Sequence, residues 1–326
     1  MSGSRYRVAV TGDQAFPDGT TIFGDIGLRR LSSAGLEWSV IAVPNAVLTP
    51  AQLDGFDALL MMGGRGITAA SLAGTALRHV ARFGAGYDAI DVGACTDAGV
   101  LLTNAPDAVR VPMAHAALAQ LLALAHNLVP KDRLVRTGRW DERVHWPGRG
   151  LQDATVGVVG LGNVGTEIVR LLRLLGVSVA GFNRTFRPGV MPLEELAAAS
   201  DYLVVTVSGN PGTRGLISAD ILARMRPGAF LINLSRGSVV DEDALISALK
   251  NGRLRGAALD VFEHEPLPPD SPLLTMDNVV LTPHSLCWTD GFARAVADSA
   301  ITAILDVAAG RTPRHAVNPE ACKVSS

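Results

Sequence analysis

Three stretches in the second half of the chain each place chemically active side chains after an apolar run that predicts a strand. The first, LINLSRG, carries Arg236; the second, GAALDVFEHE, carries Asp260 and Glu265; the third, NVVLTPH, carries His284. Because parallel strands present their carboxyl ends at one edge of a sheet, we expect these side chains to converge on one crevice.

A cation, a carboxylate and an imidazole in one crevice suit the reduction of a 2-keto acid. Arg236 would bind the carboxylate and polarise the carbonyl group, and His284 would act as the general acid or base at the carbonyl oxygen. A hydrogen bond between His284 and Glu265 would orient the ring and favour its protonated form. Arg236, Glu265 and His284 are therefore the predicted catalytic residues.

The stretch TVGVVGLGNVG, residues 155–165, has the pattern of a dinucleotide-binding turn between a buried strand and a helix. Gly160 allows the sharp turn, Gly162 lets backbone N–H groups approach a pyrophosphate, and Gly165 lets the helix pack close to the strand. The alternative is a glycine-rich turn without a ligand. The cofactor-binding residues expected here and after the following strands are Gly160, Leu161, Gly162, Asn163, Val164, Gly165, Thr206, Val207, Ser208, Thr213 and Leu234.

The end of the next predicted strand, SVAGFNRT, indicates which dinucleotide binds. Sites that prefer NAD place an acidic residue there for the ribose 2′-hydroxyl, whereas this chain has Asn183, Arg184 and Thr185. Asn183 carries no charge to repel a 2′-phosphate, and Arg184 could pair with that group. The pattern predicts a preference for NADP(H), with NAD(H) also accepted if Arg184 points to solvent.

Composition limits the partners and the location. The chain has 326 residues, a formal net charge of −2 and 48% hydrophobic residues, without a basic cluster suited to nucleic acid. No apolar run is long enough to span a membrane, and the amino end MSGSRYRVAV lacks the apolar part of a signal peptide. We therefore expect a cytoplasmic protein that binds neither nucleic acid nor membrane. The separated cysteines Cys95, Cys287 and Cys322 predict neither a disulfide framework nor a metal site.

Two series of alternating strands and helices predict an α/β protein. The first series predicts a helix at 28–34 and strands at 7–10, 38–43, 58–62, within LRHVARFGAGYDAIDV, and at 100–103. The second predicts helices at 163–175, 193–199, 220–225 and 241–250 and strands at 156–159, 178–182, 202–207, 229–233, 254–259 and 279–282. Six strands in this alternation predict a Rossmann dinucleotide-binding fold.

The expected domains follow from these series. Residues 104–284 would form the Rossmann domain, and residues 1–103 with 285–326, including a helix at 289–309, would form a discontinuous substrate-binding domain. A long apolar helix at 111–128 precedes a polar segment that carries Trp140 and Trp146. Because exposed tryptophans need a covering surface, we expect residues 111–150 to make a subunit contact, with packing inside the chain as the alternative.

The turn Gly63-Gly64-Arg65-Gly66 directly follows a predicted strand. Its free N–H groups and the guanidinium of Arg65 would suit a carboxylate or phosphate. Arg65 also motivates the hypothesis that the substrate carries a second anion, such as a phosphate or phosphonate. A solvated arginine in a tight loop is the alternative.

Taken together, the chain resembles the D-isomer-specific 2-hydroxyacid dehydrogenase family from about residue 7 to 319. The matching segments are GAGYDAIDV, VGVVGLGNVG, PGTRGLI, MRPGAFLINLSRGSVVDEDAL, GAALDVFEHEPLP and NVVLTPH. The resemblance implies a homodimer with a flavodoxin-like substrate-binding domain, a Rossmann domain and the catalytic set Arg236, Glu265 and His284. It also implies that Asp260 binds the nicotinamide carboxamide. The substrate-binding residues would be Gly64, Arg65, Gly66, Ala85, Gly86, Arg236, His284 and Trp288.

Some residues depart from the usual family pattern. His284 is followed by Ser-Leu-Cys-Trp rather than by small residues, so we expect Leu286 or Trp288 to form a wall of the substrate pocket. Cys287 has no evident proton acceptor in the sequence and is not expected to be a nucleophile. His115 lies on an apolar helix, where a packed core histidine is favoured over a second titrating group near the nicotinamide.

The expected activity is therefore the NADPH-dependent reduction of a small 2-keto acid: glyoxylate, hydroxypyruvate or an anionic analogue such as phosphonopyruvate. Two alternatives remain open from the sequence. One is a phosphite or formate dehydrogenase on the same scaffold, and the other is a corepressor-like protein that senses a dinucleotide without turnover.

Overall fold

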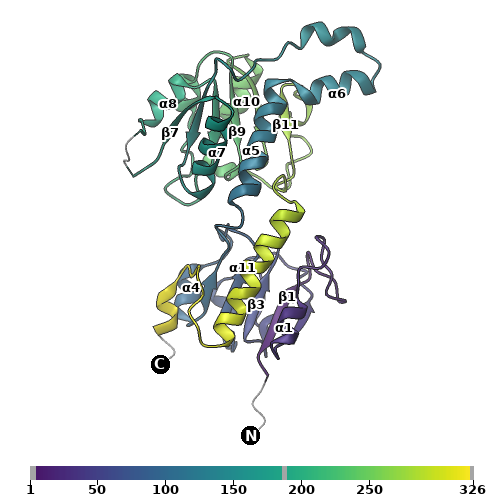
Figure 1. Cartoon of the computed structure of the whole chain (residues 1–326), viewed down its shortest axis with the longest axis vertical. Coiled ribbons are helices and arrows are strands. Elements are labelled where there is room, and N and C mark those ends of the chain that lie inside the picture. Colours follow the sequence, from purple (N-terminus) through teal and green to yellow (C-terminus); the bar gives the residue numbers. More distant parts are fainter. Residues whose placement is uncertain (1–4, 186–188, 324–326) are drawn as a thin grey trace. The chain divides into compact units, whose positions relative to one another are not determined.

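The computed structural model describes residues 5–185 and 189–323 (Figure 1). The chain divides into two compact units, which we call unit 1, Met1–Val109 with Trp288–Ser326, and unit 2, Arg110–Cys287. Unit 1 is thus built from both ends of the chain. The divisions expected after residues 103 and 284 fall after Val109 and Cys287.

Within its described residues, unit 1 has a five-stranded parallel sheet in the order β2-β1-β3-β4-β5. The strands are β1 (Arg7–Thr11), β2 (Glu37–Ile41), β3 (Ala58–Met61), β4 (His79–Arg82) and β5 (Leu101–Thr103). The strand order reverses between β1 and β3, as in flavodoxin-like folds. Ligands of such sheets bind outside the carboxyl ends of the strands at this reversal.

Helices cover both faces of this sheet. The long helix α11 (Asp290–Ala308) lies over β3 and β4, as Figure 1 shows, and Arg30 on α1 (Arg29–Ser33) pairs with Asp298 on α11 at 2.8 Å. The short helices α2 (Pro50–Leu53), α3 (Ala69–Leu72) and α4 (Val92–Asp97) supply Leu53, Leu72 and Cys95 to an apolar cluster with alternate strand residues. The sequence did not predict these three helices, because each is too short to show a period. The 3₁₀ helix η4 (Pro319–Lys323) ends the described chain.

The described part of unit 2 has a six-stranded parallel sheet in the order β11-β10-β9-β8-β6-β7. Its strands are β6 (Thr155–Val159), β7 (Ser178–Phe182), β8 (Tyr202–Val205), β9 (Ala229–Asn233), β10 (Leu254–Leu259) and β11 (Val279–Leu281). All six agree with the sequence prediction to within two residues. The order reverses between β6 and β8, so a dinucleotide would bind outside the carboxyl ends of these strands. The Rossmann-like architecture predicted from the sequence is confirmed.

Two apolar cores hold the helices of unit 2 against the sheet. Helices α8 (Leu193–Ala199), α9 (Ala219–Arg224) and α10 (Glu242–Lys250) pack on one face. Helices α5 (Arg110–Ala125) and α7 (Asn163–Leu174) pack on the other. None of the helices in the described ranges is long and apolar enough to cross a membrane.

The predicted helix at 111–128 is wrong at its carboxyl end. Helix α5 ends at Ala125, and Asn127 adopts a left-handed backbone with φ of 50° before the next helix, α6 (Leu128–Arg136). The 3₁₀ helix η1 (Trp140–His145) follows, and we call residues 128–147 the arm because α6 projects from the rest of unit 2 in Figure 1. The side-chain amide of Asn127 donates to the carbonyl of Pro147 at 3.0 Å, which ties the two ends of the arm together.

Candidate active site

The glycine turn after β6 has the steric properties predicted for it. A Cβ at Gly165 would lie 1.8 Å from the carbonyl oxygen of Gly160, so only glycine lets α7 approach the strand this closely. Gly160 has φ of 99°, and a Cβ there would lie 2.9 Å from the backbone nitrogen of Val207. A Cβ at Gly162, by contrast, would meet no described atom within 4 Å. The turn is therefore crowded toward the sheet and open on the side where a pyrophosphate would lie.

Helix α7 begins beside this opening. Its first residues are Asn163 and Val164, and no described side chain caps the helix at Gly162. The N–H groups of a first helical turn carry partial positive charge and need acceptors. Leu161, at the tip of the glycine turn, is fixed to the segment after β7, because its N–H donates to Asn183 Oδ1 at 3.3 Å.

The residues expected to select the dinucleotide lie after β7. Asn183 supports the glycine turn and also donates from Nδ2 to the carbonyl of Thr185 at 3.2 Å. Arg184 is exposed and donates from Nη2 to the carbonyl of Gly212 at 3.0 Å. The Arg184 guanidinium thus lies at the loop after β8, without an acidic partner among the described residues.

The loop after β8 contains the next group of predicted cofactor residues. The Thr206 hydroxyl donates to the carbonyl of Gly160 at 2.9 Å, which links this loop to the glycine turn. The Thr213 hydroxyl is buried and donates to the carbonyl of Ser208 at 2.7 Å. Ser235 donates to the carbonyl of Val207. Leu234 is buried in the apolar core, so its side chain supports the sheet instead of facing solvent.

The imidazole and carboxylate expected at the sheet edge do meet. His284 Nδ1 lies 2.8 Å from Glu265 Oε2, and the second oxygen of Glu265 accepts the N–H of Phe262 at 3.0 Å. The backbone of His284 is left-handed, with φ of 51°, a conformation that few residues other than glycine adopt. The ring nitrogen Nε2 has no hydrogen-bond partner in the part of the chain that the structure describes.

The charge of Glu265 depends on this arrangement. Burial by itself raises the pKa of Glu265, but the hydrogen bond from His284, the charge of a protonated His284, the N–H of Phe262 and the nearby Arg236 together bring it below its ordinary value. Glu265 is therefore ionised at neutral pH and can stabilise a positive charge on the imidazole.

Arg236 follows β9 and lies close enough to Glu265 to lower its pKa. Its Nη1 donates to the carbonyl of Ser235 at 2.7 Å, and its own carbonyl accepts Asn233 Nδ2 at 3.0 Å. The next residue, Gly237, packs directly on the loop that carries Glu265: a Cβ there would lie 1.8 Å from the carbonyl carbon of Phe262. The two loops that bear Arg236 and Glu265 are thus in backbone contact.

Replacing Gly237 with alanine is expected to separate these loops and to lower kcat/KM by about 100-fold, because small misplacements of catalytic groups are costly. The matched control is Gly150→Ala, since a Cβ at Gly150 would meet nothing within 4 Å. Steady-state kinetics of both variants, with circular dichroism to verify folding, is the measurement. Wild-type kinetics for a folded Gly237→Ala variant would show that the contact does not position Glu265.

Asp260 is 2% exposed and organises the turn that carries His284. Its Oδ1 accepts the Thr282 hydroxyl at 2.6 Å and the N–H groups of Ser285 and Leu286 at 3.2 and 3.3 Å. Burial raises the pKa of Asp260, although these three hydrogen bonds oppose the shift. Oδ2 accepts no hydrogen bond from any described residue, so it remains available to a donor such as a carboxamide.

Two residues that support Asp260, behind the turn that carries His284, were not predicted from the sequence. Thr282 donates to Asp260, and the buried Gln120 on α5 donates from Nε2 to the Thr282 hydroxyl at 3.4 Å. A polar residue on an otherwise apolar helix was the available signal for Gln120.

Two other expectations concern Cys287 and His115. Burial raises the pKa of the Cys287 thiol to about 12, with Asp260 adding to the shift, so the thiol stays protonated, as expected for a residue that is not a nucleophile. The favoured interpretation of His115 as a packed core residue is wrong, because its side chain is exposed on α5. Because apolar residues lie on most sides of α5, the sequence did not indicate which side of this helix faces the core.

The substrate-binding residues expected from the first series all lie in unit 1. Arg65 is held by Asp13, with its Nε 3.3 Å from Asp13 Oδ2. Ala85 lies in the turn after β4, where its carbonyl accepts Asn104 Nδ2 at 2.8 Å and the carbonyl of Gly86 accepts Arg82 Nε at 2.9 Å. Asp13, Arg82 and Asn104 were not predicted as site residues from the sequence.

Trp288, at the start of the second segment of unit 1, belongs to an aromatic group. It makes an edge contact with Phe23 at 5.3 Å between ring centroids, and Phe23 also packs on Phe83 and Phe292. Trp288 is 41% exposed, so one side of its ring remains available. Leu286, the other candidate wall residue, is partly buried against the core of unit 2.

Similarity to known proteins shows which family this chain belongs to. The family model of the D-isomer specific 2-hydroxyacid dehydrogenase NAD binding domain matches residues 118–285. A glyoxylate reductase from Korarchaeum cryptofilum is 38% identical over 261 residues, which cover 76% of this chain and 78% of that protein. The chain belongs to the D-isomer-specific 2-hydroxyacid dehydrogenase family. It is therefore an NAD(P)-dependent oxidoreductase that acts on CH–OH groups.

Other members of the 2-hydroxyacid dehydrogenase family extend the comparison. A D-3-phosphoglycerate dehydrogenase from Methanocaldococcus jannaschii is 36% identical over 251 residues, which cover 74% of this chain but only 48% of that protein. The NADPH-dependent glyoxylate/hydroxypyruvate reductase from Sinorhizobium meliloti, solved with NADP and malonate, has a TM-score of 0.83 and 32% identity, with 97% of this chain and 98% of that chain covered.

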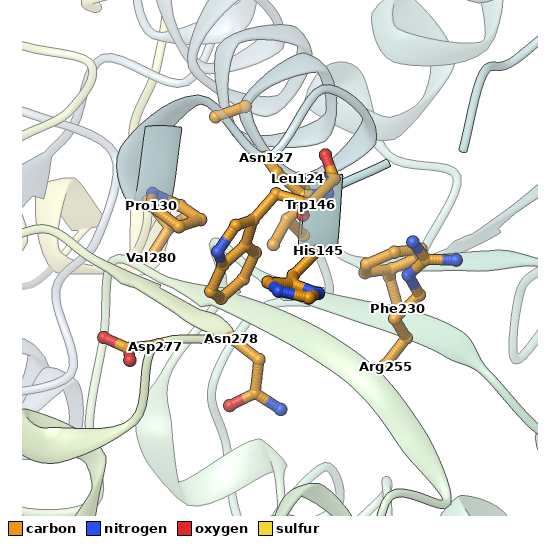
Figure 2. Close-up of a pocket in the computed structure, with 11 residues that line it drawn as sticks. Leu124, Asn127, Pro130, His145, Trp146, Phe230, Arg255, Asp277, Asn278 and Val280 are labelled. Atoms are coloured by element: carbon orange, nitrogen blue, oxygen red, sulfur yellow. Dashed lines mark hydrogen bonds between the residues drawn. The ribbon is translucent and has the colours of Figure 1, made fainter. Parts of the chain in front are cut away.

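One pocket of this family member lies away from the candidate active site. It has a volume of about 120 Å³ and lies at the base of the arm, between α5 and the amino-terminal halves of β9, β10 and β11 (Figure 2). Trp146 and His145 face Arg255 and Asn278 across it, and Arg255 donates to the carbonyl of Pro147. None of the predicted catalytic residues lines this pocket. In the described ranges, no group of three or more histidine, cysteine or acidic residues could hold a metal ion.

Proposed function

We propose that this protein is an NADPH-preferring reductase of a small 2-keto acid, of the size of glyoxylate or hydroxypyruvate, with His284, Glu265 and Arg236 as its catalytic residues. The observation that carries the proposal is the 2.8 Å contact between His284 Nδ1 and Glu265 Oε2, which leaves Nε2 without a partner among the described residues. An imidazole held in this way can deliver a proton from Nε2.

The residues present fit a nicotinamide dinucleotide. The space beside Gly162 and the uncapped first turn of α7 suit a pyrophosphate, and the free Oδ2 of Asp260 suits the carboxamide. When bound, the reduced nicotinamide supplies the hydride for the carbonyl carbon. These features of the chain support the fit by themselves. In addition, the similar reductase from Sinorhizobium meliloti was solved with NADP.

The chain's own residues supply the remaining chemistry. Arg236 binds the substrate carboxylate and polarises the carbonyl group, while His284 gives the proton on Nε2 to the carbonyl oxygen as this becomes a hydroxyl. Glu265 accepts the proton on Nδ1 in a hydrogen bond and stabilises the imidazolium before transfer. The neutral ring then regains a proton from water, so that one keto group and one proton from solvent are consumed per turnover.

The first test is a screen of purified protein for oxidation of NADPH with glyoxylate, hydroxypyruvate, 2-oxobutyrate, oxaloacetate and phosphonopyruvate, with NADH in parallel. We expect turnover with glyoxylate or hydroxypyruvate. Arg184→Gln is expected to raise KM for NADPH about tenfold and to leave KM for NADH unchanged, because only NADPH has a 2′-phosphate for the guanidinium. Tight NADPH binding without turnover of any keto acid would favour a dinucleotide-sensing protein instead.

The proposal includes a homodimer formed through the arm. Leu128, Val135, Trp140 and Val144 are each 60–69% exposed there, which is unusual for apolar residues on one short excursion. Sedimentation equilibrium is expected to give twice the chain mass, and a Val135→Glu, Val144→Glu variant is expected to give the mass of one chain.

A further inference from the structure

The pocket at the base of the arm, which we call the arm pocket, lies wholly within unit 2 (Figure 2). It has a volume of about 120 Å³, and none of the residues that line it belongs to the predicted catalytic or cofactor-binding set. Since a cavity of about 150 Å³ can hold a ring of six carbon atoms, the arm pocket has room for about five or six non-hydrogen atoms. It is therefore large enough for a small metabolite and too small to enclose a nucleotide.

Two segments that are distant in the sequence form the sides of the arm pocket. His145 and Trp146 lie on the side of the arm, whereas Arg255 on β10 and Asn278, just before β11, lie on the side of the sheet. The two sides are joined at Pro147, because its carbonyl accepts hydrogen bonds from Asn127 Nδ2 at 3.0 Å and from Arg255 Nη2. The pocket is thus preformed by contacts that leave its interior open.

Several polar groups at the arm pocket are not used by the fold. Nε1 of Trp146, both ring nitrogens of His145 and the side-chain amide of Asn278 make no hydrogen bond with any described residue. They offer donors that a bound acceptor could use.

The charges at the arm pocket favour a single negative charge on its ligand. Asp277 also lines the pocket, but it is paired with Arg133. Arg255 donates to a backbone carbonyl and has no acidic partner among the described residues. The fixed charges of these two arginines and one aspartate therefore leave one positive charge, on Arg255. A dianion is disfavoured, because the Asp277 carboxylate lines the same pocket.

The remaining wall of the arm pocket is apolar. Leu124 and Val280 line it together with Phe230, which is 2% exposed and stacks on Tyr202 with ring centroids 4.8 Å apart. Apolar walls reduce the water around a guanidinium and strengthen its attraction for a carboxylate. The wall also gives a short hydrocarbon group a surface to cover.

We propose that the arm pocket is a binding site for a small monocarboxylate. The carboxylate pairs with Arg255, and an apolar body of about two to four carbons packs between Trp146 and the wall formed by Leu124, Phe230 and Val280. The bound anion bridges β10 and the arm, so it stabilises the arm against the sheet. This inference concerns unit 2 alone and does not depend on the proposed function.

The test is a titration of the purified protein with sodium isobutyrate at constant ionic strength, followed by tryptophan fluorescence. Because Trp146 lines the pocket, the emission is expected to change with a dissociation constant of about 1 mM, an affinity that a ligand of this size can reach. Isobutyramide has the same shape without the charge and is expected to bind at least about tenfold more weakly. Trp146→Phe should remove the fluorescence change.

Arg255→Gln is expected to weaken isobutyrate binding by about tenfold or more, because it removes the charge that pairs with the carboxylate. The matched control is Arg173→Gln, which makes the same change of charge at an exposed position in the last turn of α7 and should bind isobutyrate as the wild type does. Ala123→Leu keeps Arg255 but fills part of the pocket, so it should also weaken binding. This variant tests the proposal if Arg255→Gln fails to fold.

Three results would overturn the proposal. The first is an absence of isobutyrate binding to the wild type, or unchanged binding in folded Arg255→Gln and Ala123→Leu variants. The second is loss of binding in Arg236→Gln but not in Arg255→Gln, which would place the carboxylate at the predicted catalytic residues instead. The third is a fluorescence signal that changes when the protein is diluted but not when isobutyrate is added, which would assign the pocket to a second copy of the chain.

Discussion

Replacing His284 with glutamine is expected to lower kcat for 2-keto acid reduction by about 10³-fold, within the range that general acid catalysis contributes. Glutamine can still meet Glu265 from its side-chain amide, but it has no titratable proton to give to the carbonyl oxygen. The loss should therefore appear in kcat at all pH values from 5 to 9, because the glutamine side chain does not titrate in that range.

Dinucleotide binding separates this effect from a structural one. The dissociation constant of NADPH, measured by fluorescence, should change by less than about twofold in His284→Gln, because Asp260 and the glycine turn are unaltered. Glu265→Gln is the matched comparison: it keeps the imidazole but removes the anion that faces Nδ1, so kcat should fall while NADPH binding is unchanged. A His284→Gln variant with kcat near that of the wild type would remove His284 from the mechanism.

Acidification is expected to destabilise unit 1 through His79, the first residue of β4. This side chain is fully buried, and burial lowers its pKa from 6.5 to about 3. Its Nε2 lies 2.9 Å from the Thr103 hydroxyl, while Nδ1 has no partner in the described residues. The folded protein thus keeps the ring neutral where the unfolded chain binds a proton.

The direction of the pH effect follows from these two pKa values. Above pH 6.5 the ring is neutral in both states and contributes no pH dependence. Between pH 6.5 and about 3 only the unfolded state is protonated, so the free energy of unfolding falls by about 1.4 kcal/mol for each pH unit. Below pH 3 both states are protonated and the loss is complete.

Calorimetric unfolding between pH 7.5 and 4 measures this loss. His79→Gln is the informative variant, because its amide can still reach the Thr103 hydroxyl but cannot titrate. The difference in stability between the wild type and this variant should change with pH in the stated direction, while other acid-sensitive groups cancel. Parallel pH curves for the two proteins would show that His79 is not the source of the acid sensitivity.

The sequence predicted the sheets well because their strands are buried on both faces and read as short apolar runs between turn residues. Strands β7, β9 and β10 lie where they were expected, as does α8. Helix α6 was not predicted as a separate element, since it is polar on most of its surface and the break at Asn127 depends on a left-handed backbone that only a minority of asparagines adopt.

The candidate site shows the same limit. Arg236, Glu265 and His284 lie together in unit 2 because each follows the carboxyl end of one of the neighbouring parallel strands β9, β10 and β11. The ion pair of Arg65 could not be predicted from the sequence, because its partner, Asp13, lies 52 residues earlier and its approach depends on the absence of a side chain at Gly63. Side-chain contacts between loops that follow different strands depend on the tertiary structure, and no local sequence pattern predicts them.

The hydrogen bonds that run from Gln120 through Thr282 to Asp260 have a fixed direction. A hydroxyl has one proton, and an ionised Asp260 can only accept it, so Gln120 must turn its NH₂ group toward Thr282 and leave Oε1 buried without a partner. Protonation of Asp260 would allow every bond in the row to reverse and the amide of Gln120 to rotate by half a turn. The orientation of the Gln120 amide in the core therefore depends on whether the Asp260 carboxylate at the edge of the sheet is ionised or protonated.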